Sequence, residues 1–163
     1  MPALLLLLLA AWAFALGGCA STPPLPPESR LTARFHLENQ QGQGVPATLP
    51  RSGVSLGLDP QPVLTEGDII NVELVQVDLG RCLMFQVSPS AARALYRMTG
   101  SNQGRRLVLF LDGVASGARR IDGPIADGVL YCFVEVDDDA LPGMVEKLRR
   151  TTEFLQRELR RKG

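Results

Sequence analysis

Alternating apolar and polar residues predict several half-buried strands along this chain. The clearest case spans residues 30–38, where the apolar positions are Leu31, Ala33, Phe35 and Leu37. Successive side chains of a strand point to opposite faces, so a period of two is typical of a strand with one face in the core. Less regular alternation predicts further strands over residues 52–58, 71–78, 82–87, 114–121 and 129–136.

One further segment is apolar at every position. Residues 107–111 read LVLFL, which predicts a central strand buried on both faces, with helices covering one of them. Two polar segments are predicted to interrupt the strands. Residues 39–50 have the Gly, Gln and Pro content of a loop, and the prolines within residues 59–62 are expected to end the strand before them.

Two segments have a helical pattern. Ser88 followed by Pro89 is a good helix start, because the hydroxyl can cap the helix and proline lacks only an N–H that is unpaired there. This helix is predicted over residues 89–100, with Ala91, Ala92, Leu95 and Met98 or Thr99 on its buried face. A final helix is expected to be capped by Asp137, Asp138 and Asp139, with a buried stripe of Leu141, Val145, Leu148, Leu155 and Leu159.

These elements predict an α+β fold: a mostly antiparallel sheet of about five to seven strands, with two helices packed on one face. We expect a single α+β domain over residues 31–163. Before it, residues 19–30 contain four prolines and predict an extended tether.

The first residues have the pattern of a secretory signal peptide. Residues 4–16 form an uncharged apolar run, which has the length of a signal-peptide core and is too short to span a bilayer as a helix. Residues 1–18 are therefore predicted to be a signal peptide. An uncleaved membrane anchor is the alternative.

The residues that end this run resemble the lipobox of bacterial lipoproteins. Leu16, Gly17 and Gly18 place one branched apolar and two small residues before Cys19. The resemblance implies cleavage after Gly18 and lipidation of Cys19 with a diacylglycerol thioether, and it implies a mature end that carries three acyl chains. Two or more chains give stable anchoring. By the sorting rule of enterobacterial lipoproteins, Ala20 favours the outer over the inner membrane. An ordinary signal peptide that leaves Cys19 as a free thiol is the alternative.

The net charge argues against one class of function, and its distribution along the chain is uneven. The formal charge is zero, which argues against nucleic-acid binding, since nucleic-acid-binding domains are usually basic. From Lys147 onward, seven Lys or Arg stand against two Asp or Glu, so this end carries +5 and the rest −5. The basic end is a candidate contact for anionic lipid or a partner, although a solvated helix end explains it as well.

Candidate catalytic and metal-binding residues are few. His36 is the only histidine and has no Cys, Asp or Glu at ligand spacing, so we predict a surface histidine and no metal site. Residues 137–139 lack calcium-loop spacing, and residues 100–106 lack the lysine of a phosphate loop. The sequence therefore predicts no catalytic residue, no metal and no cofactor.

The two remaining cysteines are predicted to lie on opposite strand faces. Cys132 shares the apolar phase of Leu130, whereas Cys82 alternates with Leu83 and Phe85. Because a disulfide needs Cβ atoms within about 4.5 Å, this phase argues against a bridge between them.

Several short motifs over residues 64–149 resemble the head subdomain of the first periplasmic domain of SecD. The matching positions are Leu64, Thr65, Asp68, Ile69, Leu95, Thr99, Asn102, Gly104, Arg105, residues 107–111, Asp112, Gly113, Ile121, Gly123, Pro124, Ile125 and Gly128. Residues 116–119 lack the proline of the family at this step. The resemblance implies the fold and an extracytoplasmic setting. It implies a binding element without catalytic residues.

The sequence thus predicts a lipid-anchored, periplasm-facing, non-enzymatic module that binds a protein or peptide of the cell envelope. Strand addition at an exposed edge is the expected mode, with residues 30–38 or 114–121 as candidate edges. An enzyme or cell-wall factor using Asp68, Asp112 or Asp122 is the alternative, and a structural lipoprotein without ligand is a third. The partner, the process and the oligomeric state are left open.

Overall fold

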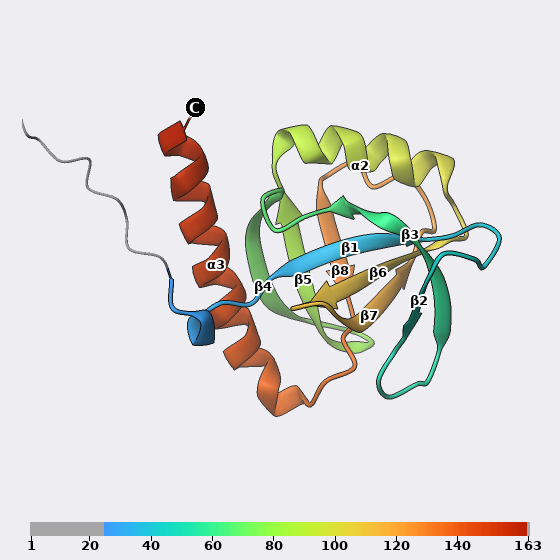
Figure 1. Cartoon of the computed structure of the whole chain (residues 1–163), viewed down its shortest axis with the longest axis horizontal. Coiled ribbons are helices and arrows are strands. Elements are labelled where there is room, and N and C mark those ends of the chain that lie inside the picture. The colour runs from blue at the N-terminus through green and yellow to red at the C-terminus, as the bar shows by residue number, and fades with distance from the viewer. Residues whose placement is uncertain (1–24, 163) are drawn as a thin grey trace, which may run out of the picture.

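The computed structural model describes residues 25–162, and its strands form two antiparallel sheets (Figure 1). The strands are β1 (Ala33–Glu38), β2 (Val45–Thr48), β3 (Ser55–Leu64), β4 (Ile69–Val77), β5 (Gly80–Val87), β6 (Arg106–Leu111), β7 (Val114–Arg120) and β8 (Val129–Cys132). One sheet has the order β2-β3-β1-β6-β7 and the other β4-β5-β8. The predicted α+β class is confirmed. The described residues form eight strands, one more than the five to seven expected.

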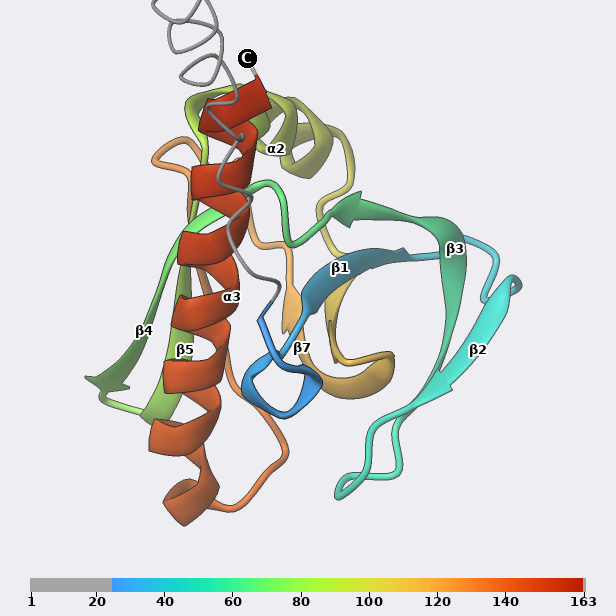
Figure 2. The same ribbon diagram turned by 60° about the vertical axis from the view of Figure 1, so that its left-hand side comes forward.

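Two α-helices and two short 3-10 turns complete the described residues: α2 (Pro89–Ser101), α3 (Leu141–Lys162), η1 (Pro27–Ser29) and η2 (Asp138–Ala140). Helix α2 crosses one end of the strands and α3 runs beside β4 (Figures 1 and 2). The predicted cap of α2 is confirmed, because Ser88 Oγ accepts a hydrogen bond from the Ala91 N–H. No helix within residues 25–162 is both long and apolar enough to cross a bilayer.

The larger core lies between the two sheets and both helices. At its centre Phe35 of β1 meets Phe85 of β5 edge to face, with ring centroids 5.1 Å apart and an interplanar angle of 89°. Both rings are fully buried. This geometry places the positive edge of one ring against the negative face of the other, which stabilises the pair by about 0.5–1.5 kcal/mol beyond the area it buries.

Strand β6 is buried on both faces, as its sequence predicts. Leu107 and Leu109 face the larger core, to which both helices contribute. Val108 points the other way, into a smaller core supplied mainly by strands: Ala47, Leu49, Leu56, Leu58 and Ala115. The five-stranded sheet therefore curls so that β2 and β3 cover the second face of β6.

Two of the predicted interruptions are wrong. The segment 39–50 contains β2, and β3 continues through residues 59–62 to Leu64. Pro60 and Pro62 are tolerated because β2 pairs only with Ser55–Leu58 of β3. Beyond Leu58 the outer side of β3 has no partner strand, so a missing N–H on that side removes no ladder hydrogen bond.

The end of the last predicted strand also differs. Strand β8 ends at Cys132 and not at residue 136, and the chain then forms a single bridge between Val134 and Gly117 of β7. Asp137 makes no side-chain cap, and residues 138–140 form η2 before α3 begins at Leu141. The acidic residues therefore precede the helix without capping it.

Gly117 permits this bridge. A Cβ at this position would lie 2.2 Å from the Phe133 carbonyl oxygen, closer than atoms can approach. Next to it the Glu135 N–H donates to the Ser116 carbonyl oxygen over 2.6 Å. The absence of a side chain at residue 117 thus lets the edge of one sheet meet the chain that leaves the other.

Both described cysteines are free, buried thiols. Cys132 is the direct cross-strand partner of Leu83, so Cys82 lies on the opposite face of β5, as the strand phase predicts. Burial raises the pKa of the Cys132 thiol to about 12, against the lowering effect of the Arg119 charge. Burial also raises the pKa of Cys82.

Replacing Gly117 with Ala should weaken the junction of the two sheets. We expect Gly117→Ala to lower the free energy of unfolding by about 1–3 kcal/mol in urea titrations, because backbone must move to admit the methyl group. Gly123→Ala is the matched control, since no atom lies within 4 Å of its new Cβ. Equal stabilities of the two variants would contradict the role of Gly117.

The buried Cys132 thiol should make the fold sensitive to high pH. Its pKa is raised in the folded state, so the stability it contributes is complete below its unfolded pKa of about 8.5 and is lost as pH rises toward 12. Between pH 9 and 10.5 we expect wild type to lose about 2 kcal/mol more than Cys132→Ala, measured by urea unfolding. Parallel pH profiles of the two proteins would refute this.

Candidate functional site

The three carboxylates considered for catalysis do not converge. Both Asp68 and Asp112 stabilise turns. Asp68 Oδ2 accepts hydrogen bonds from the Thr65 N–H and hydroxyl at 2.9 and 2.8 Å. Asp112 lies in the β6–β7 turn with φ 46°, and its Oδ1 accepts the Thr32 N–H and hydroxyl at 2.7 and 2.9 Å.

The third carboxylate, Asp122, is 80% exposed and lies 3.9 Å from Arg120. Within residues 25–162 no three His, Cys, Asp or Glu side chains gather as a metal site would require. The residues of the enzyme alternative thus lie at separate turns, and the partners given for each of them differ.

The other polar residues singled out in the sequence have structural partners. His36 is half-buried, with Nδ1 3.1 Å from the Asp59 carbonyl oxygen and its ring against Phe110. The turn after α2 directs Arg105 back onto β1 and β3, where its guanidinium donates to the Glu38 carbonyl oxygen and, over 2.9 Å, to Asp59 Oδ2. Residues 100–106 thus form the turn that ends α2 and do not form a phosphate loop, as the sequence predicts.

The free edges of the two sheets were the predicted binding elements, and one of the two candidates is wrong. Residues 30–38 contain β1, which pairs with β3 on one side and β6 on the other. It is an inner strand and offers no edge. Residues 114–121 contain β7, which does end its sheet.

Helix α3 closes the outer edge of β4. Arg149 Nε donates to the Val72 carbonyl oxygen over 2.7 Å. Two turns further along, Gln156 Nε2 donates to the carbonyl oxygens of Gly67 and Ile69 at 3.2 and 3.1 Å. Side chains that occupy edge carbonyls block the pairing of another strand.

Strand β2 is protected by proline. Leu49 N–H donates to the Val54 carbonyl oxygen, which fixes the hydrogen-bonded phase of this hairpin. Pro46, opposite Gly57, then falls at a non-hydrogen-bonded pair, where backbone groups point away from β3. The outer edge of β2 therefore lacks a donor at its second residue.

The edges of β7 and β8 face each other across an open cleft. They meet at the Gly117–Val134 bridge, and no ladder joins them beyond it within the described chain. We call the region lined by residues 119–131 the β7–β8 cleft. It has a volume of about 420 Å³. Its lining includes Arg119 of β7, Ile121 just after this strand, and Val129 and Tyr131 of β8.

Hydrogen-bond phase shows which backbone groups face this cleft. Val87 N–H donates to the Gly128 carbonyl oxygen, so Leu130 is also paired with β5 while Val129 and Tyr131 turn their backbone groups away from it. Two of these outward groups already have side-chain partners. Asp127 Oδ1 accepts the Val129 N–H at 3.0 Å, and Arg119 Nη1 donates to the Tyr131 carbonyl oxygen at 3.3 Å.

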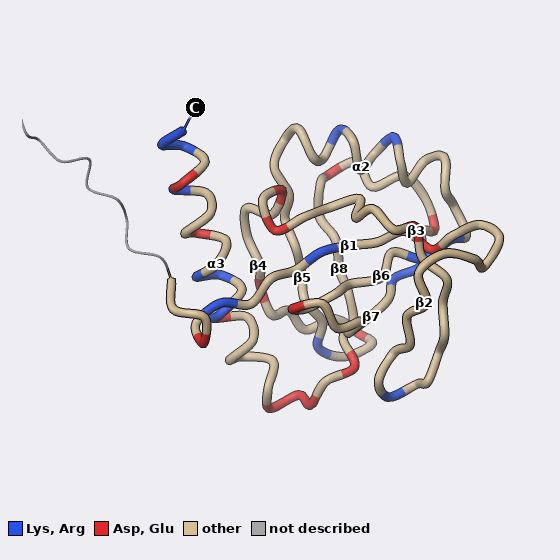
Figure 3. Tube along the Cα trace, in the orientation of Figure 1, with Lys and Arg blue, Asp and Glu red and all other residues tan. Residues whose placement is uncertain are grey.

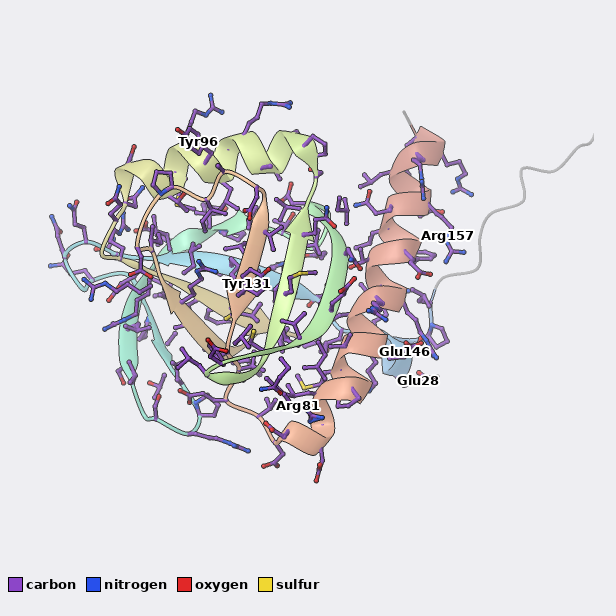
Figure 4. All side chains as sticks on the ribbon, turned by 180° about the vertical axis from the view of Figure 1, so that it is seen from behind. Glu28, Arg81, Tyr96, Tyr131, Glu146 and Arg157 are labelled. Atoms are coloured by element: carbon purple, nitrogen blue, oxygen red, sulfur yellow. The ribbon has the colours of Figure 1, made fainter. Side chains whose placement is uncertain are left out.

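A second hollow adjoins the cleft along α2. It measures about 500 Å³ and is lined by Ala92, Arg93, Tyr96, Arg97 and Ala126. Ala126 belongs to both hollows. Tyr96 on α2 and Tyr131 on β8, labelled in Figure 4, are 50% and 40% exposed. Two half-exposed aromatic rings beside backbone donors and acceptors form a surface suited to an extended peptide.

The charge along α2 is unbalanced. Arg93 and Arg97 are exposed, lie one turn apart and have no acidic partner among residues 25–162. Neighbouring like charges on a helix are mildly destabilising, so this pair does not serve the helix itself.

The carboxylate of Glu135 lies just beyond the Gly117–Val134 bridge, at the end of the cleft where β7 and the chain after β8 meet. Glu135 accepts hydrogen bonds from the Arg51 N–H at 2.7 Å and from the Ser52 hydroxyl at 2.6 Å. Desolvation opposes its ionisation, yet these hydrogen bonds lower the pKa of Glu135 below the usual value. The tip of the β2–β3 hairpin is thereby fastened to the segment that follows β8.

Sequence reasoning missed the residues that line the cleft. Tyr131 lies between Leu130 and Cys132, so the predicted strand phase already placed a large ring on the outer face. Tyr96 likewise follows Leu95 of the buried stripe. A large aromatic residue at a position predicted to face outward is the feature of the sequence that indicates a binding surface here. Cys19 and Gly18, the predicted lipidation and cleavage residues, lie outside the described residues.

Comparison with known proteins finds similarity at the level of structure. No family model matches the chain, and no curated protein matches it. A SecDF chain described as a membrane component that enhances protein export matches with a TM-score of 0.58 and 20% identity, over 79% of this chain and 71% of that chain.

Two further SecDF structures match. SecDF in a super-membrane-facing form has a TM-score of 0.58 and 20% identity, over 74% of this chain and 19% of that one. SecDF from Thermus thermophilus, described as a translocon-associated membrane protein, has a TM-score of 0.50 and 22% identity, over 76% and 20%. This chain spans about a fifth of those two SecDF chains. At such identities the likeness concerns the fold, and the predicted SecD-like α+β fold is confirmed.

Proposed function

We propose that this chain is a non-enzymatic binding module of the bacterial cell envelope that holds an extended protein segment at the β7–β8 cleft. The observation that carries the proposal is the set of backbone groups of Val129 and Tyr131 that point into the cleft. A strand added there would pair with β8 through its backbone.

The surroundings of the cleft support an extended ligand. Tyr131 and Tyr96 supply apolar contact area, while Arg93 and Arg97 favour a segment that carries acidic side chains. The side chains of Asp127 and Arg119 occupy edge groups in the free protein, and an incoming strand would displace them. Such side chains also keep the unliganded edge from pairing with other chains.

The setting is proposed from the sequence and the fold together. We place the chain on the periplasmic side, held by lipid at Cys19 after cleavage behind Gly18, with Ala20 favouring the outer membrane. The fold shared with SecDF, a membrane component that enhances protein export, supports a place beside a membrane and makes exported polypeptides a candidate ligand class.

Photo-crosslinking tests the cleft. A benzoylphenylalanine at Tyr131 or Tyr96 should crosslink to envelope polypeptides in cells, because both side chains border the site. The same group at Leu79, which is 85% exposed at the β4–β5 turn, is the control and should give at most about a tenth of the yield.

A proline variant tests the mode of binding. Tyr131→Pro removes an outward N–H and leaves the ladder to β5 intact, so it should abolish crosslinks from residue 96 with little loss of stability. Unchanged crosslinking from residue 96 in this folded variant would sink strand addition. No crosslink from either tyrosine would favour a structural lipoprotein.

Replacing the proposed lipidated residue tests the anchor. Wild type should incorporate a labelled fatty acid and fractionate with membranes, because the Cys19 thiol is the atom to be alkylated. Cys19→Ser should lose the label completely. Cys82→Ser is the control and should keep it, since Cys82 is buried in the fold. Labelling that survives Cys19→Ser would contradict the anchor.

A further inference from the structure

The last turns of α3 extend the helix beyond the core that its first half covers. Upstream, the buried stripe consists of Leu141, Val145, Leu148, Thr151 and Thr152. Leu155 and Leu159 continue this stripe at helical spacing, yet Leu155 is half-buried and Leu159 is 52% exposed. The helix therefore ends in an apolar face that the described residues cover only in part.

Basic side chains surround this apolar face. They are Arg157, Arg160, Arg161 and Lys162, against Glu153 and Glu158 over the same turns, a net charge of +2. Arg157 and Arg161 each pair with a nearby glutamate at 3.3 and 3.0 Å. The Arg157–Glu153 pair is exposed on both sides and contributes little, so Arg157 can exchange Glu153 for another anion.

The opposite end of the same helix is acidic. Asp137, Asp138 and Asp139 precede α3, and Figure 3 shows red at this end and blue at the other. The 22 residues of α3 separate the two charges by about 33 Å. The molecule is therefore polarised along α3.

The chain enters the fold beside the basic half of α3. Leu25 lines a small pocket of about 150 Å³ with Phe154 and Leu155. Leu31 N–H then donates to Thr151 Oγ1 over 3.0 Å. The first described residues thus lie about 10–16 Å along the helix from Lys162.

Cys19 precedes Leu25 by six residues, which span at most about 20 Å. An anchor at Cys19 therefore keeps the bilayer surface within reach of the end of α3. The same holds if the apolar run of residues 4–16 is itself the anchor.

We propose that the C-terminal turns of α3, residues 155–162, dock on the anionic phospholipid surface to which the chain is anchored. Leu155 and Leu159 enter the headgroup layer and the four basic side chains bind lipid phosphates. The acidic end of α3 then faces away from the membrane, so the domain has a fixed orientation. This inference rests on the membrane anchor in the proposed function.

Hydrogen exchange on the anchored chain tests this docking. The full lipidated chain is placed in nanodiscs of neutral phosphatidylcholine or of the same lipid with about one third phosphatidylglycerol. We expect backbone amides of residues 155–162 to exchange at least about ten-fold more slowly on the anionic discs. The protection should disappear at 0.5 M salt, which screens headgroup charge.

Two charge-matched variants separate a specific face from general attraction. Arg157→Glu, Arg160→Glu and Lys162→Glu together should abolish the difference between the two discs. Arg93→Glu, Arg97→Glu and Arg120→Glu change the net charge equally at exposed positions on α2 and β7 and should retain it.

The outcomes distinguish the docking from the anchor. A wild-type chain that fails to remain with either disc overturns the anchor, and the docking with it. A chain that remains on both discs but exchanges residues 155–162 at equal rates overturns the docking alone. The docking is also overturned if the two triple variants show the same difference in exchange between neutral and anionic discs.

Discussion

The edge-to-face contact of Phe35 and Phe85 is the point on which this fold depends. The two rings come from different sheets, Phe35 from β1 and Phe85 from β5. Around them pack the apolar faces of both helices and of β6. A chain of this size must draw most of its stability from one such core. The smaller core extends it, because β2 and β3 curl over the second face of β6.

Once the core is formed, the sheet edges decide what the surface can bind. Helix α3 covers β4 with Arg149 and Gln156, and Pro46 removes a donor from β2. Gly117 lets the remaining two edges meet at one end. The β7–β8 cleft is open beyond this bridge, and the half-exposed tyrosines lie beside it. The Gly117–Val134 bridge joins the two sheets at one point only. Beyond this point, within residues 25–162, the edges of β7 and β8 stay unpaired, which leaves the proposed binding cleft open.

Charge organises the molecule on a larger scale. The net charge of zero conceals the acidic residues that precede α3 and the basic end of this helix, which lie a helix length apart. Leu25 enters the fold at the basic half, so the proposed tether and the basic end share one side. A short tether and a polarised helix together would hold the cleft at a defined height above the membrane.

Local pattern determined much of this structure. Alternation located β1, and Ser88 with Pro89 located the start of α2, because side-chain period and capping depend on residues close in sequence. Motif order suggested the SecD-like fold. Tertiary structure alone decided that β1 is an inner strand, because its partners β3 and β6 come from distant parts of the chain. It also decided that residues 59–62 continue a strand, since the missing neighbour beyond Leu58 makes proline harmless. The cleft belongs to this second class: Tyr96, Arg119 and Tyr131 come together only when two sheets and a helix have packed.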